Sequence, residues 1–399
     1  MPTVTDIELF AVDLPFRKPF RHAAAERATS ESLFLRIQLD SGVAGWGECL
    51  PRSYVSGESR EEAFALLREV VLPALLGTTF QSLAESCSFL EKCDGRAPAE
   101  WVPPEVPQSS AWCSVDLALI DAFGQVSGQP AWAGEHRGRG SANSRSAGGL
   151  PREYRYSAVV SAGRGWRDAV SLLKIRAYGF RHVKLKLEQE GAVEAAAMAR
   201  RLLGPAIDLR VDANMAWEVE QALALMSALR AFGIESFEQP IAADDLAGLA
   251  RLVKESAAGI VVDEGLTDRD SLQQLISQRA CTGVNVRISK CGGLIGARAR
   301  CHEALDAGLM LQVGCQVGES SLLSAAHVTL MSALARSSST VRYAEGCFGR
   351  HLLREDPVSP SVQFGYGGRP PARPRGPGLG VRLDQAKLLQ WTVDRARVS

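Results

Sequence analysis

Acidic side chains follow three successive apolar runs of the chain. Asp212 ends the run RVD, Glu238 comes directly after Ser236-Phe237, and Asp263 follows IVV. If these runs are neighbouring parallel strands, their carboxyl ends share one pocket. Carboxylates that converge repel one another and need a hard cation, and an oxygen-only set suits Mg²⁺ or Mn²⁺ better than zinc. The pattern therefore predicts a magnesium or manganese site at Asp212, Glu238 and Asp263.

Three lysines lie in similar runs on either side of these acids. Lys184 and Lys186 in VKLKL are two residues apart, which is the period of a strand, so both face the same side. Adjacent ammonium groups lower each other's pKa, which lets a lysine act as a base near neutral pH. Lys290 follows GVNVRIS and is expected on the far side of the pocket. The arrangement predicts removal of a proton from one face of a substrate carbon and its return to the other.

Such a pocket requires a scaffold that gathers strand ends. Beyond the first third of the chain, short β-branched runs alternate strictly with helical stretches, which predicts a parallel sheet closed into a (β/α)₈-type barrel. The runs are Tyr156–Val160, His182–Leu187, Asp208–Val211, Ser236–Glu238, Ile260–Val262, Gly283–Ile288 and Leu309–Val313.

The first part of the chain shows a different pattern, with strand-like alternation followed by helical periodicity. It predicts a small α+β domain that caps the barrel. Its expected strands are Ile7–Val12 and Ser32–Leu39, the latter followed by a turn at Asp40-Ser41-Gly42, and its expected helices are Arg60–Leu76, Gln81–Lys92 and Ser109–Val126. The predicted divisions are the cap at 1–130, a Gly/Ser/Arg-rich linker at 131–155, the barrel at 156–365, and a C-terminal segment packed on the cap at 366–399.

Composition limits the classes of partner. Lys+Arg and Asp+Glu each number 45 in 399 residues, so no net field favours nucleic acid or a membrane surface. The nine scattered cysteines are typical of reduced thiols in a cytoplasmic protein, and no long apolar run suggests a membrane span. With so little net charge to oppose self-association, we expect a homo-oligomer.

The motifs together resemble the enolase superfamily, and within it the muconate lactonizing enzyme subgroup. The shared motifs are GWGE from Gly45 to Glu48, K-x-K, D-A-N, E-Q-P, D-E and S-K-C-G-G, in the family's order. The resemblance implies Lys186 and Lys290 as acid/base residues, with Lys184 tuning Lys186 and touching the substrate carboxylate. It also implies magnesium ligands at Asp212, Glu238 and Asp263. The mandelate racemase branch uses a His-Asp pair in place of the second lysine, and no histidine occupies such a strand end here.

In proteins of this kind two loops of the cap close over the barrel mouth, here Phe16–Ser30 and Pro51–Glu58. Arg21 and Tyr54 are their candidate substrate contacts, and Gln316, Glu319 and Glu345 are the candidates at later strand ends. Dipeptide epimerases of the subgroup carry Asp-x-Asp at the eighth strand end to hold an ammonium group. This chain has Tyr343-Ala344-Glu345 there, with one acid.

These features predict an isomerase that abstracts the proton α to the carboxylate of a small molecule through a metal-stabilised enediolate. Epimerisation requires two lysines, whereas cycloisomerisation and syn-dehydration of the o-succinylbenzoate type only permit them, which favours an isomerase over a lyase. A catalytically silent binding protein on the same scaffold, and Schiff-base chemistry at a lysine, remain alternatives.

Overall fold

The computed structural model describes residues 1–399 except 23–24, 132–153, 162, 164, 188 and 335–340. The side chains of residues 20–26 also lie outside the described part. The predicted linker at 131–155 therefore falls almost wholly outside the described residues.

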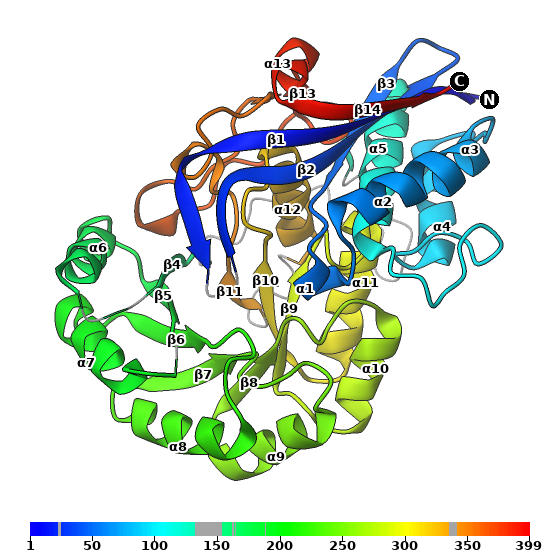
Figure 1. Cartoon of the computed structure of the whole chain (residues 1–399). Coiled ribbons are helices and arrows are strands. Elements are labelled where there is room, and N and C mark those ends of the chain that lie inside the picture. The colour runs from blue at the N-terminus through cyan, green and yellow to red at the C-terminus, as the bar shows by residue number, and fades with distance from the viewer. Residues whose placement is uncertain (23–24, 132–153, 162, 164, 188, 335–340) are drawn as a thin grey trace, which may run out of the picture.

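Eight parallel strands form the larger unit, in the order β4-β5-β6-β7-β8-β9-β10-β11 (Figure 1). A parallel bridge between Tyr156 and Ala344 joins the two ends of this sheet. The predicted barrel is thus confirmed. Its strands are β4 (Ala158–Ser161), β5 (His182–Lys186), β6 (Asp208–Asp212), β7 (Ile234–Glu238), β8 (Gly259–Val262), β9 (Gly283–Arg287), β10 (Met310–Gly314) and β11 (Val341–Ala344).

A helix follows each of the first seven strands and covers the outside of the barrel (Figure 1). After β11 the chain instead makes short 3₁₀ turns through a Gly- and Pro-rich segment, so the unit is a modified (β/α)₇β barrel. The barrel helices are α6 (Trp166–Ala177), α7 (Ala192–Leu203), α8 (Val219–Arg230), α9 (Leu246–Ser256), α10 (Arg269–Ser277), α11 (Gly293–Asp306) and α12 (Ser321–Ala333).

The cap contains an antiparallel sheet in the order β14-β1-β2-β3. Its strands are β1 (Val4–His22), β2 (Ala25–Leu39), β3 (Ala44–Cys49) and, from the C-terminus, β14 (Thr392–Val398). Strands β1 and β2 pair as far as His22 and Ala25, with an irregularity between Pro15 and Phe20. The prediction of a loop over Phe16–Ser30 was therefore wrong, because cross-strand pairing continues through most of that segment.

Helix α5 (Ser109–Ser127) packs directly on β3, and the glycines of GWGE allow the contact. A Cβ on Gly47 would lie 1.8 Å from the carbonyl oxygen of Ser114, so only glycine fits between strand and helix. The predicted helix Arg60–Leu76 forms in three parts, with a π-helical turn before Pro73. The other cap helices are α1 (Ser53–Ser56), α2 (Arg60–Leu66), η1 (Leu67–Val71), α3 (Leu72–Leu75) and α4 (Leu83–Cys93).

The C-terminal segment returns from the barrel to the cap, where β14 pairs with β1 from Ile7 to Val12. On the way it forms η4 (Gly349–His351), β12 (Val358–Ser359), η5 (Tyr366–Gly368), β13 (Arg382–Leu383) and α13 (Gln385–Gln390).

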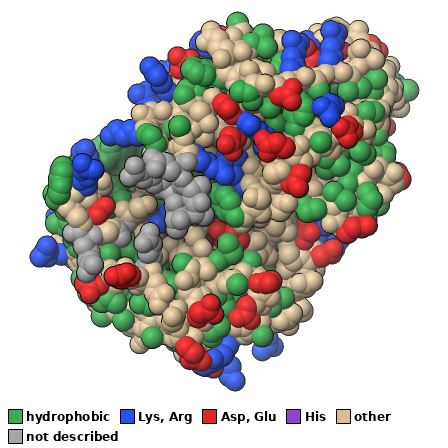
Figure 2. All heavy atoms as spheres, in the orientation of Figure 1, with side chains coloured by type: hydrophobic (Ala, Val, Ile, Leu, Met, Phe, Trp, Pro, Cys, Tyr) green, Lys and Arg blue, Asp and Glu red, His purple; other side chains and the backbone are tan. Residues whose placement is uncertain are grey.

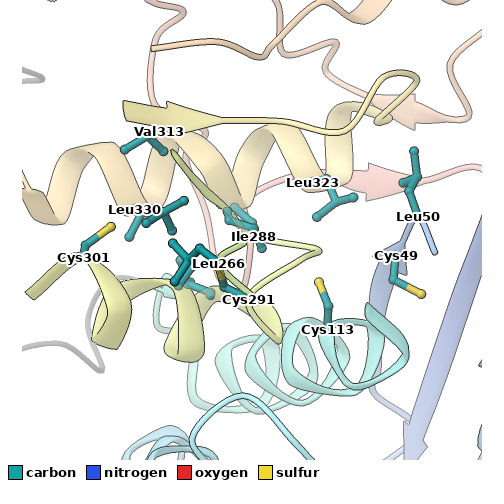
Figure 3. Close-up of a cluster of buried hydrophobic side chains, with 14 of the residues drawn as sticks. Cys49, Leu50, Cys113, Leu266, Ile288, Cys291, Cys301, Val313, Leu323 and Leu330 are labelled. Atoms are coloured by element: carbon teal, nitrogen blue, oxygen red, sulfur yellow. The ribbon is translucent and has the colours of Figure 1, made fainter. Parts of the chain in front are cut away.

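Buried carboxylates of the cap bind the first turns of two barrel helices. Glu48 at the end of β3 accepts hydrogen bonds from Ser320 and from the backbone of Leu323 at the start of α12. Asp116 on α5 accepts a hydrogen bond from the backbone of Leu294 at the start of α11. Apolar side chains from α5, α11, α12 and the strand ends complete this interface (Figure 3). Cap and barrel therefore share one core.

Acidic and basic side chains are interspersed over the face shown in Figure 2, as the balanced composition suggests. All nine cysteines are buried thiols. Among the described helices, none is both long and apolar enough to cross a bilayer.

Candidate active site

The three acids meet at the carboxyl ends of neighbouring strands. Asp212 and Glu238, the last residues of β6 and β7, are register partners, and Asp263 comes directly after β8. All three side chains are buried. The barrel thus brings together the acids that the sequence singled out, at the edge where its strands share a pocket.

Contrary to the sequence-based argument, these acids are not without partners. Lys184 Nζ lies 3.0 Å from Glu238 Oε2 and 3.2 Å from Asp212 Oδ2. Burial alone would raise the pKa of Glu238, but Lys184 and two arginines lower it to about 2. Burial likewise opposes the charged form of Lys184, yet the surrounding carboxylates raise its pKa above its usual value. The prediction that two lysines lower each other's pKa was therefore wrong for Lys184, because carboxylates surround it.

Two cations, Lys290 and Arg287, contact Asp263. Lys290 Nζ donates to Asp263 Oδ1 at 2.7 Å, to the Asp263 carbonyl, and to the Asn285 carbonyl at 2.9 Å. Arg287, at the end of β9, contacts the other oxygen of Asp263. Lys290 is fully buried, and burial lowers its pKa to about 7, so a substantial fraction is neutral near neutral pH.

Lys186 lies on the opposite side of the pocket. Its Nζ donates to Asn214 Oδ1 at 3.0 Å and lies 3.7 Å from Asp212 Oδ2. Burial lowers the pKa of Lys186; Asp212 opposes this shift, whereas Lys184 and Arg287 add to it. Since β5 and β9 are four strands apart in an eight-stranded barrel, the two lysines approach from opposite walls.

Below the acids a buried network fixes Lys184. Glu345, directly after β11, accepts a contact from Lys184 Nζ at 2.8 Å and another from Arg210 on β6. Arg210 also donates to Ser157 Oγ at 3.0 Å, and its guanidinium carbon lies 4.2 Å from the ring centroid of Tyr343. The carboxylate of Glu345 is thus engaged by two protein cations.

The other predicted substrate contacts are placed less uniformly. Gln316 and Glu319 are buried after β10, where Glu319 accepts the backbone N–H of Gln316 at 2.7 Å. Burial raises the pKa of Glu319 to about 8. Tyr54 on α1 is 40% exposed and lies under the guanidinium of Arg27. The side chain of Arg21 lies outside the described residues.

The carboxylates of Asp212, Glu238 and Asp263 are suitable ligands for a metal ion, but their present arrangement would have to change to bind one. Among the described residues, no group of three or more His, Cys, Asp or Glu side chains is arranged to hold one, because Lys184 and Arg287 stand between the acids. However, Asp212 Oδ2 and Asp263 Oδ2 are buried and accept no aligned hydrogen bond, although both contact cations. Three oxygen donors at adjacent strand ends fit Mg²⁺. Binding would require Lys184 and Arg287 to turn away.

The sequence analysis missed several residues of this site. Asn214 joins Lys186 to Glu264, since its Nδ2 donates to Glu264 Oε1 at 3.2 Å. Asn285 and Gln312, on β9 and β10, each donate to Glu238 at 2.8 Å. Asn285 and Gln312 could have been identified from the sequence, because each is a polar residue within a mostly apolar strand.

Family models match both parts of the chain. One described as "Enolase C-terminal domain-like" covers residues 168–387, and one described as "Mandelate racemase / muconate lactonizing enzyme, N-terminal domain" covers residues 4–133.

Curated relatives include an N-succinyl-L-Arg/Lys racemase of Bacillus cereus, 27% identical over 98% of both chains. An L-Ala-D/L-Glu epimerase of Bacillus subtilis is 30% identical over 78% of this chain and 80% of its own. A chloromuconate cycloisomerase of Cupriavidus pinatubonensis is 28% identical over 95% of this chain and 96% of its own.

Solved structures show the same fold over the whole length. The N-succinyl Arg/Lys racemase of Bacillus cereus superposes with a TM-score of 0.83 at 26% identity, covering 100% of both chains. A dipeptide epimerase of Cytophaga hutchinsonii, complexed with Mg and D-Ala-L-Val, superposes with a TM-score of 0.81 at 23% identity and the same coverage, which shows the fold alone. The chain therefore belongs to the mandelate racemase/muconate lactonizing enzyme family of the enolase superfamily, and it is an isomerase of that superfamily.

Proposed function

We propose that this protein is a magnesium-dependent isomerase that moves the proton on the carbon next to a substrate carboxylate, with Lys186 and Lys290 as its acid and base. The observation that carries the proposal is the placement of these lysines on opposite walls of the barrel, with the pKa of each lowered by burial. The group of three acids lies between them. A flat carbon centre held there has one lysine on each face.

The protein side chains divide the work. The neutral lysine removes the α-proton from one face, and the protonated lysine returns a proton to the other, which inverts the carbon. Lys184 keeps Glu345 as a carboxylate partner at 2.8 Å even when it turns away from Asp212 and Glu238, so it would supply positive charge beside the substrate carboxylate. Asn214 holds Lys186 by accepting from its Nζ at 3.0 Å.

Asp212, Glu238 and Asp263 would hold Mg²⁺, or Mn²⁺ in its place. Bound there, the ion would offset the negative charge that develops on the substrate carboxylate as the proton leaves. The oxygen-only donor set and the two acid oxygens without an aligned hydrogen bond support this assignment. The presence of Mg in the complex of the Cytophaga hutchinsonii epimerase, which has the same fold, is consistent with it.

The names of the curated relatives support an isomerase over a lyase. They describe a racemase, an epimerase and a cycloisomerase, whose substrates are by name an N-succinylated amino acid, a dipeptide and a chloromuconate. All of these compounds are carboxylic acids. We infer that the substrate of this chain is also a small carboxylate.

The proposal is tested by measuring metal binding and α-proton exchange together. We expect the unmodified protein to bind Mn²⁺ in a paramagnetic resonance titration, and to incorporate deuterium at the α-carbon of a carboxylate substrate only when Mg²⁺ or Mn²⁺ is present. Glu238→Gln should lose both properties. Glu235→Gln is the matched control, because Glu235 lies on the same strand but is exposed. Unchanged Mn²⁺ affinity in Glu238→Gln, or exchange in excess chelator, would contradict the proposal.

A further inference from the structure

The backbones of the two site lysines are held in different ways. Lys186 lies within β5, where pairing with β4 on one side and β6 on the other extends to it, so the barrel sheet fixes its backbone. Lys290 lies outside the sheet, three residues after Arg287, the last paired residue of β9. Its position therefore depends on the turn that carries it, residues 288–293 (the Lys290 turn).

Before Lys290, the turn is attached to the cap through Ser289. This side chain is buried, and its Oγ accepts the backbone N–H of Leu50 at 3.0 Å and is hydrogen-bonded to Ser110 Oγ at 2.9 Å. Leu50 follows β3 and Ser110 lies in the first turn of α5, so both partners belong to the cap. Glu58 in turn accepts the backbone N–H of Ser110 at 2.7 Å. The cap segment 51–58, which is expected over the barrel mouth, is therefore attached at both ends to Ser289 or to its partner.

After Lys290, the turn is attached to the same cap helix. Asp116 on α5 is buried and accepts the backbone N–H of Leu294, in the first turn of α11, at 2.7 Å. Gly292 has a φ of +76°, and a Cβ there would lie 1.9 Å from the carbonyl oxygen of Gly95, which belongs to the cap loop after α4. Cys291 lies in the apolar core that cap and barrel share (Figure 3). Cap residues thus contact the turn on both sides of the lysine.

The side-chain contacts of Lys290 cannot by themselves keep it aligned during a reaction. Its Nζ donates to Asp263 and to the Asn285 carbonyl, and a group that exchanges a proton with the substrate must change such contacts. Proton transfer requires the reacting atoms at close range, and a misplacement of about 1 Å can cost about a hundredfold in rate. The alignment must therefore come from the backbone of the Lys290 turn.

We propose that the cap positions Lys290 for proton transfer, with Ser289 and Asp116 as the positioning residues. Loss of either contact should impair proton transfer on the face of the substrate carbon that Lys290 serves. It should spare the face that Lys186 serves, because the barrel sheet holds Lys186. The inference rests on the proposed function, and deepens it by giving the cap a part in proton transfer at one of the two lysines.

Two variants release the Lys290 turn, and each has a matched control. Ser289→Ala removes the hydroxyl that two cap groups contact; its control is Ser86→Ala, because Ser86 is a buried cap serine that bonds within its own helix. Asp116→Asn keeps the volume but turns one acceptor of backbone N–H groups into a donor. Its control is Asp121→Asn, because Asp121 is buried on the same helix and accepts two backbone N–H groups from β3 and the C-terminal segment. Circular dichroism checks that each variant folds.

The exchange of α-protons in D₂O reads the two faces separately. Each change is combined with Lys186→Ala, in which only Lys290 remains, and with Lys290→Ala, in which only Lys186 remains. We expect Ser289→Ala and Asp116→Asn to slow the exchange at least about tenfold in the Lys186→Ala protein. In the Lys290→Ala protein the same changes should alter the exchange rate by less than about twofold, and the two control changes should have equally small effects in both proteins.

Amide hydrogen exchange, measured by mass spectrometry without substrate, reads the attachment of the turn independently of turnover. A peptide that covers residues 288–296 should exchange faster in Ser289→Ala and Asp116→Asn than in the unmodified protein, because local opening exposes its backbone amides. The same peptide should exchange at the unmodified rate in the two control variants.

The outcomes separate this inference from the proposed function. Equal loss of α-proton exchange in the two lysine variants, no loss in either, or unchanged amide exchange of the turn overturns the positioning role. If the unmodified protein exchanges no α-proton although the turn opens in Ser289→Ala and Asp116→Asn alone, the proposed isomerase chemistry is overturned and the attachment of the turn to the cap stands. Exchange on opposite faces by the two lysine variants, without any effect of the cap contacts, does the reverse.

Discussion

Replacing Arg210 tests whether Glu345 belongs to the buried framework of the site. Arg210 is 1% exposed, contacts Glu345, donates to Ser157 and lies over Tyr343. Arg210→Met keeps much of the volume but removes the charge. Glu345→Gln removes the partner charge and leaves the arginine buried.

The expected magnitude follows from the burial of the pair. Removing one partner of a buried ion pair costs about 3 to 5 kcal/mol, because the remaining charge stays desolvated. Glu345 keeps Lys184 as a partner after Arg210→Met, so the cost should lie near the lower end, at about 3 kcal/mol. Glu345→Gln leaves Arg210 buried without its carboxylate partner, while Lys184 keeps Asp212 and Glu238, so this change should cost more than Arg210→Met. The double variant removes the charge pair together, and should be less destabilised than the sum of the single variants by about 1 to 3 kcal/mol.

The free energy of unfolding in urea is measured for the unmodified protein, the two single variants and the double variant, which completes a double-mutant cycle. Arg342→Met is the matched control. Arg342 lies on the same strand as Tyr343 and 5.5 Å from that ring, but its side chain is 60% exposed. Its loss should cost less than about 1 kcal/mol. If Arg210→Met costs no more than Arg342→Met, or if the single changes add without coupling, then Glu345 is free to bind substrate and the network described here is wrong.

Three other perturbations test the cap, the lysines and the assembly. Gly47→Ala should prevent stable folding or lower the melting temperature sharply, because the new Cβ would lie 1.8 Å from a helix carbonyl oxygen. Gly259→Ala is the control and should have a much smaller effect, because the atom closest to its new Cβ is 3.3 Å away. Equal melting temperatures of the two variants would refute the argument. The turnover rate should have a bell-shaped dependence on pH. Below about pH 7 Lys290 gains a proton and both lysines are charged, so the rate should fall about tenfold per pH unit. At higher pH the second lysine loses the proton that it must donate, so the rate should fall again. A rate that is constant from about pH 5 to 9 would argue against two lysines. Light scattering at micromolar concentration should show a homo-oligomer, and a monomeric mass would reject that prediction.

Sequence reasoning recovered the barrel because its signals are local. Seven of the eight strands are short runs followed by a helix, and residues at the strand ends must share a pocket once the sheet closes. Asp212, Glu238 and Asp263 could thus be grouped from strand ends alone. The length of the β1–β2 hairpin could not be predicted from the sequence, because Arg17, Lys18 and Pro19 interrupt the strand pattern and the pairing resumes beyond them.

The charged residues around the three acids could not be predicted from the sequence for a different reason. Arg210 and Glu345 lie on strands that are distant in sequence, and only the closure of the barrel brings them together. Arg287 carried a readable signal, since it shares the inward face of β9 with Asn285 by strand periodicity. Without these cations, the acids were expected to need a metal to coexist. With them, the metal assignment depends on donor chemistry and on the acid oxygens without an aligned hydrogen bond.

The central claim is that Lys186 and Lys290 serve opposite faces of one carbon. It is tested most directly by α-proton exchange in D₂O, with each enantiomer of a substrate supplied separately to Lys186→Ala and Lys290→Ala. We predict that neither variant interconverts the enantiomers, and that each exchanges only the enantiomer whose proton faces its remaining lysine, so the two variants are stereochemically complementary. Interconversion by Lys290→Ala at the parental rate, or exchange of the same enantiomer by both variants, would contradict the two-lysine account.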